Sequence, residues 1–186
     1  MRINLPNGLT IARILMVPLM VIAFYLPFRG TNLIAAAMFT IAAITDWLDG
    51  YLARRYQQTS DFGAFLDPVA DKLMVTVALF LIVQADKTAL MAVTAAIIVG
   101  REITISALRE WMAAIGERTK VGVAWLGKVK TVVQMIAIII LLMQHRYVGK
   151  PLYWFGKALL IAAAALTIWS AVVYLRAAWP VIRSRA

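Results

Sequence analysis

The sequence contains no cysteine and only one histidine, His145. Without cysteine the chain can form no disulfide, no zinc–thiolate site and no thiol nucleophile. A single histidine also excludes a metal site built from several imidazoles. Acidic residues are scarce as well, since nine Asp and Glu face 19 Lys and Arg in 186 residues. Any place where acidic residues gather therefore stands out.

Apolar residues are abundant instead, at 63% of the chain, whereas soluble domains have about 45–50%. Six apolar segments approach the roughly 20 residues that a helix needs to cross a bilayer. Their runs are continuous rather than alternating, which argues against spanning β-strands. The sequence predicts an all-α integral membrane protein, one domain over residues 1–186 with six transmembrane helices near 9–28, 32–53, 64–84, 89–111, 124–144 and 152–175.

The formal net charge of +10 does not indicate nucleic-acid binding, because the cations fall mostly between long apolar runs, as membrane-flanking residues do. Six spans place both termini on one side, and that side holds most of the Lys and Arg. The bias predicts cytoplasmic termini in an inner-membrane protein. Residues 1–13 mix polar and apolar side chains, so they form either a short interfacial helix or an ordinary flanking segment.

Four of the nine acidic residues lie between positions 46 and 71. Asp46 and Asp49 are three residues apart, and Asp67 and Asp71 are four apart, so each pair shares one helix face. A short link lets the two faces converge at one depth near the cytoplasmic side. Ionisable groups in a span are costly and usually functional. Oxygen ligands without sulfur or imidazole indicate Mg²⁺ or Mn²⁺, and four carboxylates suggest two ions.

Two other interpretations of this acidic cluster compete with a metal site. The aspartates could cap helix ends and pair with Arg54, Arg55 and Lys72. They could also serve an ion-coupled transporter, since carboxylates within spans often form ion pathways. Their clustering at one membrane face, rather than along a path, favours the metal site.

Small residues accompany the carboxylates: Gly50 and Ala53 follow Asp49, and Gly63 precedes Asp67 by one turn. They allow helices or a ligand to approach the backbone closely. Arg54 lies beside them and can pair with a carboxylate or a phosphate.

Basic residues within the fourth apolar segment form a second candidate site. Arg101 lies about 18 Å into that segment at 1.5 Å per residue, and an arginine at such depth needs a partner. Glu102 supplies part of one, but adjacent helical residues point about 100° apart, so we expect Arg101 to face the cavity. Arg109 follows two turns later, and Lys128 and Lys130 begin the fifth segment. Together these cations predict a pocket for a phosphomonoester, although snorkelling to lipid head groups is the alternative for Arg109 and Lys128.

The spacing of residues 46–71 resembles the CDP-alcohol phosphotransferase signature D-x2-D-G-x2-A-R-x8-G-x3-D-x3-D at every fixed position. The resemblance implies six transmembrane helices around a cytoplasm-facing polar cavity, commonly in a homodimer. It implies two metal ions on Asp46, Asp49, Asp67 and Asp71, with Asp71 as the catalytic base. It also implies a cytidine diphosphate site formed by Asp49, Gly50, Ala53, Arg54 and Gly63.

Within that family the chain is most similar to the bacterial phosphatidylglycerophosphate synthases. The similarity rests on four stretches: N4-L-P-N7-G-L-T10-I-A-R13, F62-G-A-F-L-D67-P-V-A-D71-K72, R101-E102-I-T-I-S106-A-L-R109-E110 and G127-K128-V-K130-T131. It implies transfer of a phosphatidyl group from CDP-diacylglycerol to sn-glycerol 3-phosphate, with CMP as the second product. Another acceptor alcohol is the alternative within the family, and Arg101 and Arg109 favour a phosphorylated one.

Overall fold

The computed structural model describes residues 5–56, 61–116 and 125–185. Within these ranges the side chains of residues 5, 6, 47, 49–56, 61, 62, 64, 125–128, 145, 184 and 185 lie outside the description. The described part is helical throughout and consists of five elements: α1 (Leu5–Tyr25), α2 (Thr31–Tyr56), α3 (Asp61–Asp86), α4 (Ala89–Ala114) and α5 (Trp125–Arg185).

The last element, α5, is two helices joined by a sharp reversal. Its backbone leaves helical geometry at Gln144 and Gly149, and φ is positive at both. A glycine takes such a φ without steric cost, and Pro151 follows two residues later, where it fits the start of a helix. The first arm of α5 precedes the reversal and the second follows it. The six predicted apolar segments therefore coincide with four separate helices and the two arms of α5.

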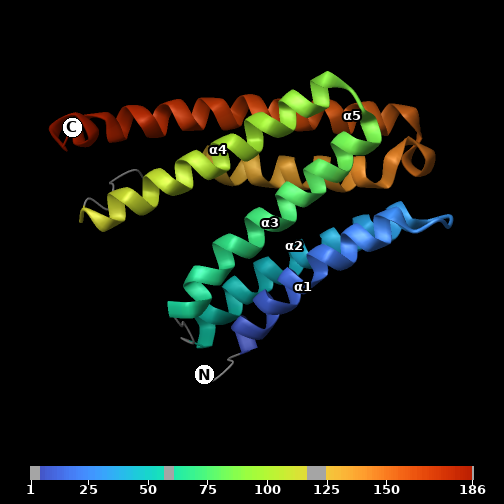
Figure 1. The fold of residues 1–186 in the computed structure, drawn as a ribbon, viewed down its shortest axis with the longest axis horizontal. Coiled ribbons are helices and arrows are strands. Elements are labelled where there is room, and N and C mark those ends of the chain that lie inside the picture. Colours follow the sequence, from blue (N-terminus) through green and yellow to red (C-terminus); the bar gives the residue numbers. More distant parts are fainter. Residues whose placement is uncertain (1–4, 57–60, 117–124, 186) are drawn as a thin grey trace.

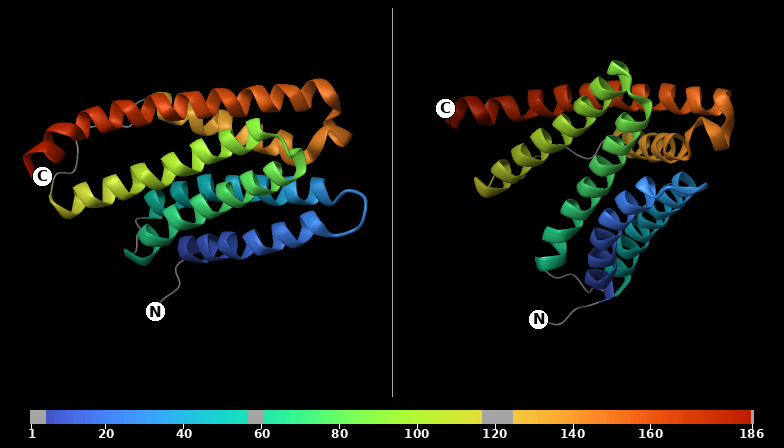
Figure 2. Two further views of the ribbon diagram at one scale, coloured as in Figure 1. Left: turned by 45° about the horizontal axis from the view of Figure 1, so that its top comes forward. Right: turned by 45° about the vertical axis from the view of Figure 1, so that its right-hand side comes forward.

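The ends of the helices divide into two groups (Figures 1 and 2). The start of α1, the end of α2, the start of α3, the end of α4 and the end of α5 lie toward one end of the molecule. The turns between α1 and α2, between α3 and α4 and within α5 lie at the other. The helices thus run alternately up and down, and the end of α2 and the start of α3, which carry signature residues, share an end with the start of α1 and the end of α5. We refer to this end as the site end.

Helix contacts arrange the bundle around α2, α3 and the first arm of α5. Helix α1 packs against α2 and α3, while α4 packs against α3 and α5. The buried core contains residues from every element, among them Met20, Phe39, Leu79, Ile98 and Leu141. The two arms of α5 approach closely at Gly156, where an added Cβ would lie 2.8 Å from the Ile140 Cγ2 atom.

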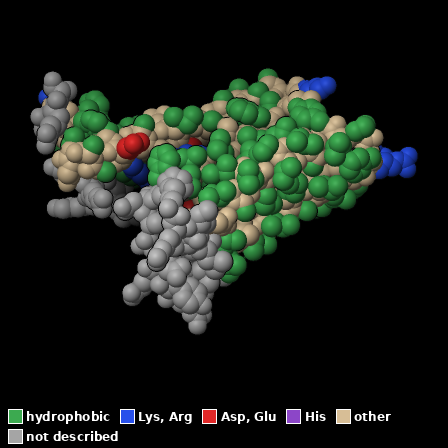
Figure 3. Space-filling model, turned by 60° about the horizontal axis from the view of Figure 1, so that its bottom comes forward, with side chains coloured by type: hydrophobic (Ala, Val, Ile, Leu, Met, Phe, Trp, Pro, Cys, Tyr) green, Lys and Arg blue, Asp and Glu red, His purple; other side chains and the backbone are tan. Residues whose placement is uncertain are grey.

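The outside of the bundle is strongly apolar. Figure 3 shows hydrophobic side chains over most of the visible face, and large ones such as Leu15, Phe80 and Trp169 are at least 60% exposed. Contiguous apolar surface of this extent indicates an environment other than water. The interior, by contrast, holds polar groups such as Arg13 and Lys130. This distribution fits helices that are surrounded by lipid.

Three stretches of the described chain are long and apolar enough to cross a membrane: Asn7–Tyr25, Ala89–Ala114 and Arg146–Arg183. Two shorter apolar helices, Thr31–Asp46 and Val129–Gln144, accompany them. The prediction of an all-α protein with membrane-spanning character is confirmed at this level. From Leu5 onward the N-terminal segment is part of α1, and its Asn7, Thr10 and Arg13 are buried in the bundle.

Candidate active site

Three of the four signature aspartates have described side chains, and they meet α1 at the site end. Asp46 lies on α2, and Asp67 and Asp71 lie one turn apart on α3. Gly63, one turn before Asp67, is buried. Asp49, Gly50, Ala53 and Arg54 continue α2 beyond Asp46, but their side chains lie outside the described set.

Arg13 on α1 connects the carboxylates of two helices. Its Nη1 donates to Asp46 Oδ1 at 2.5 Å and lies 3.5 Å from Asp71 Oδ1. The arginine side chain is 1% exposed, whereas the aspartates are 38% and 47% exposed. A buried guanidinium needs anionic partners, and here one nitrogen reaches two of them. Arg13 thus fixes the relative position of α1, α2 and α3 at the site end.

Thr10 adds a second link from the same face of α1, because it lies three residues before Arg13. Its Oγ1 donates to Asp67 Oδ1 at 2.7 Å. Sequence reasoning included both residues in a stretch of family similarity but gave neither a role in the site. The available signal was the three-residue spacing of Asn7, Thr10 and Arg13 in an otherwise apolar segment, which marks a buried polar face on α1.

A cavity of about 660 Å³ opens beside Asp67 and Asp71. Its walls come from α3, α4 and the first arm of α5, with residues Phe65, Asp67, Pro68, Val69, Asp71, Lys72, Val75, Thr76, Ile98, Val99, Glu102, Ser106, Arg109, Glu110, Thr131, Gln134 and Met135. The charged members are four carboxylates and two cations. The volume falls within the range of small-molecule sites, and the cavity joins the carboxylates of α3 to the basic region of α4.

Among the predicted acceptor-site cations whose side chains are described, Arg109 lines this cavity, and Lys72 is a second cation on its wall. The Arg109 guanidinium lies over the ring of Tyr174 in the second arm of α5, with Cζ 5.1 Å from the ring centroid. Such a cation–π contact orients the guanidinium. Arg109 is therefore placed to bind an anion in the cavity.

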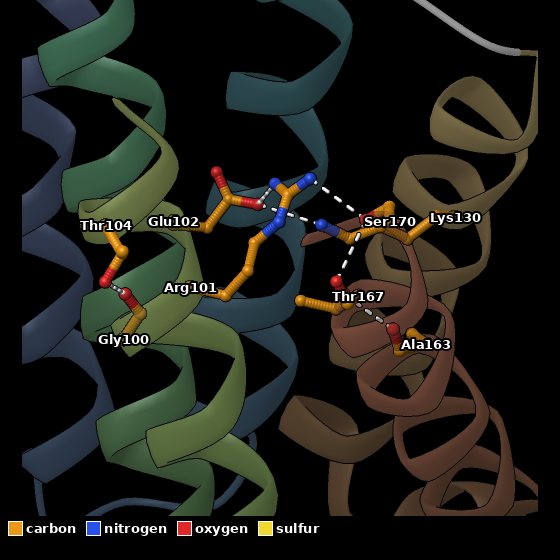
Figure 4. Close-up of polar contacts among 8 residues, drawn as sticks. All are labelled: Gly100, Arg101, Glu102, Thr104, Lys130, Ala163, Thr167 and Ser170. Carbon is orange, nitrogen blue, oxygen red and sulfur yellow. Dashed lines mark hydrogen bonds and ion pairs between the residues drawn. The ribbon is translucent and has the colours of Figure 1, made fainter. Parts of the chain in front are cut away.

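Arg101 and Lys130 take up a different position, in a network centred on Glu102 (Figure 4). Arg101 Nη1 and Lys130 Nζ both donate to Glu102 Oε1, at 3.0 and 2.9 Å. Arg101 Nη2 also donates to Ser170 Oγ at 3.0 Å. Glu102 lines the cavity, whereas neither of these two cations is among its wall residues. The network ties α4 to both arms of α5.

Lys128, the other lysine predicted for this site, lies on the first turn of α5. Its side chain is outside the described residues, so the structure gives it no partner or direction. Glu102 itself was considered only as a partner of Arg101. Sequence reasoning did not identify it as a wall residue of the cavity.

The donor set fits a hard divalent cation. Asp46, Asp67 and Asp71 offer carboxylate oxygens, the ligands that Mg²⁺ and Mn²⁺ prefer. Asp46 and Asp71 already converge on one cationic atom, Arg13 Nη1. Among the described side chains no three acidic groups come together as a complete ligand set, and Asp49 is not among those described. The four carboxylates and two cations of the cavity wall also favour added positive charge before anionic substrates bind.

A family model for CDP-alcohol phosphatidyltransferases matches residues 3–169 of the chain. The chain belongs to the CDP-alcohol phosphatidyltransferase family. The resemblance noted in residues 46–71 is thereby confirmed over most of the sequence, and the chain is a transferase.

Curated relatives of this phosphatidyltransferase share about half of its residues. One from Sodalis glossinidius is 51% identical over 178 residues, which cover 96% of each chain. One from Pseudomonas fluorescens is 49% identical and covers 97% of this chain and 93% of its own. One from Haemophilus influenzae is 51% identical, with coverages of 96% and 95%. All three are named CDP-diacylglycerol–glycerol-3-phosphate 3-phosphatidyltransferase.

Replacement of Arg13 tests its role in holding the phosphatidyltransferase site together. Arg13→Gln should lower the free energy of unfolding by about 1.5–3 kcal/mol, because a hydrogen bond to a charged group is lost and Asp46 and Asp71 are left without their shared cation. The measurement is thermal unfolding of the purified protein in detergent with EDTA present. Arg29→Gln is the matched control, since Arg29 is exposed at the opposite end. Equal stability of the two variants would contradict the assignment.

Proposed function

We propose that this chain transfers the phosphatidyl group of CDP-diacylglycerol to sn-glycerol 3-phosphate and releases CMP. The observation that carries the proposal is the cavity that brings Asp67 and Asp71 of α3 into one space with Arg109 of α4. It supplies carboxylates for metal binding and proton transfer at one wall and a phosphate-binding cation at another. The printed names of the relatives support the same donor and acceptor.

Asp71 is the proposed catalytic base. Its carboxylate lines the cavity and is 47% exposed, so an acceptor hydroxyl can reach it. The acceptor oxygen attacks the phosphorus that carries the diacylglycerol, and Asp71 takes the hydroxyl proton. The bond to the bridging oxygen of the pyrophosphate breaks, and CMP leaves. Arg13 Nη1 lies 3.5 Å from Asp71 Oδ1 and orients the carboxylate.

Asp46, Asp49, Asp67 and Asp71 are the proposed ligands for the metal, two ions of Mg²⁺ or Mn²⁺. When bound there, such ions would neutralise the pyrophosphate and make CMP a better leaving group. Thr10 and Arg13 orient three of these carboxylates from α1. Asp49, Gly50, Ala53, Arg54 and Gly63 form the proposed cytidine diphosphate site, on the stretch that carries the family signature.

The acceptor phosphate is assigned to the basic residues of α4 and α5. Arg109 is the first choice, because it lines the cavity and Tyr174 orients it. Arg101 and Lys130 pair with Glu102, and their positive charges make the electrostatic potential in the cavity more favourable for an anion. Lys128 completes the proposed set from the first turn of α5.

We propose that the chain crosses the bacterial inner membrane six times, with both termini and the site end in the cytoplasm. We also propose that it forms a homodimer. Bacterial relatives and the apolar outer surface support this arrangement. The absence of cysteine allows a direct test with impermeant thiol reagents. A cysteine in place of Arg183 should react only from the cytoplasm and one in place of Arg29 only from outside. The reverse pattern would overturn the orientation.

An acceptor panel tests the reaction itself. Purified protein should release CMP from CDP-diacylglycerol when glycerol 3-phosphate is supplied, but not with serine or inositol phosphate. EDTA should stop turnover, and Mg²⁺ or Mn²⁺ should restore it. Asp71→Asn should reduce kcat by at least about a hundredfold, the usual scale of a general base. Asp86→Asn, the same change at the opposite end, should leave turnover per folded molecule unchanged. Preferential transfer to another alcohol would reject the assigned acceptor.

Arg109→Lys should raise the KM for glycerol 3-phosphate roughly ten- to a hundredfold, because a charge-assisted contact to phosphate contributes about 1.5–3 kcal/mol and lysine lacks the planar fork. The KM for CDP-diacylglycerol should change little. Lys150→Gln, at an exposed position beside the reversal in α5, is the control. A selective rise in the KM for CDP-diacylglycerol would instead assign Arg109 to the donor.

A further inference from the structure

Glu102 is a carboxylate on the wall of a cavity whose proposed substrates are both anionic. Its side chain is 32% exposed and contributes to the wall between Ile98 and Ser106 of α4. A carboxylate there repels a phosphate, so it needs a reason for facing the cavity. Pairing with Arg101 and Lys130 accounts for only one of its two oxygens.

Both cations bind the same oxygen atom, Oε1. Figure 4 shows the second carboxylate oxygen directed away from Lys130 and from the second arm of α5. Within the described part of the chain no hydrogen bond reaches Oε2. An ionised carboxylate has acceptor sites on both oxygens, so Oε2 can accept a hydrogen bond from a ligand in the cavity while Oε1 stays occupied.

The position of Glu102 suits a hydroxyl group of the acceptor. Arg109 lies seven residues later on the same face of α4, about 10 Å along the helix. Asp71, on α3, faces the same cavity. An acceptor with its phosphate at Arg109 and its reacting hydroxyl at Asp71 occupies the same cavity that Glu102 lines. Glycerol 3-phosphate carries one more hydroxyl, on its central carbon, which can donate a hydrogen bond.

We propose that Glu102 is a specificity-determining residue that accepts, through Oε2, a hydrogen bond from the hydroxyl of the acceptor that does not react. This inference rests on the proposed function, because it requires a phosphorylated polyol in the cavity. The two cations on Oε1 fix the carboxylate in place, and Ser170 fixes Arg101 in turn. A site built to bind a hydroxyl discriminates strongly against an analogue that lacks it, because its polar group is then left unpaired.

The test compares two acceptors, glycerol 3-phosphate and 3-hydroxypropyl phosphate, which lacks the central hydroxyl. Wild-type protein should prefer glycerol 3-phosphate in kcat/KM by roughly tenfold or more, the scale of a hydrogen bond to a charged group. Glu102→Leu should bring this preference to about one, and Glu102→Gln should give an intermediate value. Gln is close in shape to Glu, which keeps the test informative if the Leu variant folds poorly.

Glu110→Gln is the matched control, because it makes the same change at another carboxylate of the cavity wall and leaves the Glu102 network intact. It should leave the ratio of the two kcat/KM values unchanged. An unchanged ratio in both Glu102 variants, or no preference in wild-type protein, would overturn the inference while transfer to glycerol 3-phosphate continues. Absence of transfer from wild-type protein to either acceptor would instead reject the proposed function.

Discussion

The arrangement depends on one constraint: charge inside an apolar bundle must be compensated across helices. Three networks meet it among the described residues. Arg13 connects α1 to Asp46 and Asp71, Glu102 connects α4 to Lys130, and Asp86 Oδ2 lies 2.6 Å from Lys157 Nζ between α3 and the second arm of α5. Removing one partner of such a pair leaves an uncompensated charge, which costs far more than the pair contributes. These networks therefore specify which helices meet and at what register.

The same kind of ion pair serves opposite purposes at the two ends of the bundle. The side chain of Asp86, at the end of α3, is 4% exposed and also accepts hydrogen bonds from Tyr153 and Thr88. Both of its oxygens have partners within the bundle, so it stabilises that end. Asp46 and Asp71 are about 40–50% exposed beside a cation that is fully buried. Their carboxylates are thus accessible from outside the bundle interior, as carboxylates that bind metal or take a proton must be.

The sequence predicted the features that depend on local spacing. Helical periodicity places Asp67 and Asp71 on one face, and the structure has both on the cavity wall. Features that depend on which helices pack together could not be read from one chain. Arg13 reaches its partners across 33 and 58 residues. Arg101 shows a further limit, because the angle between neighbouring positions suggested that it faces the cavity. Its long side chain reaches both Glu102 and Ser170 instead, since a flexible stem of several bonds outweighs the backbone direction.

The cavity wall has more carboxylates than cations, although both proposed substrates are anionic. The positions of these charges, rather than their sum, explain how anions can bind there. The carboxylates separate into two groups on different helices, Asp67 and Asp71 on α3 and Glu102 and Glu110 on α4. The α3 group is compensated by Arg13 and, in the proposed reaction, by divalent ions that then attract the pyrophosphate. On α4, Glu102 is compensated by Arg101 and Lys130, which leaves Arg109 for the proposed contact with the acceptor phosphate. In the proposed reaction each substrate then meets a positive region of its own, and the reacting hydroxyl meets Asp71. In that reaction the separation of charge within the cavity, rather than its net value, determines which end of each substrate is bound where.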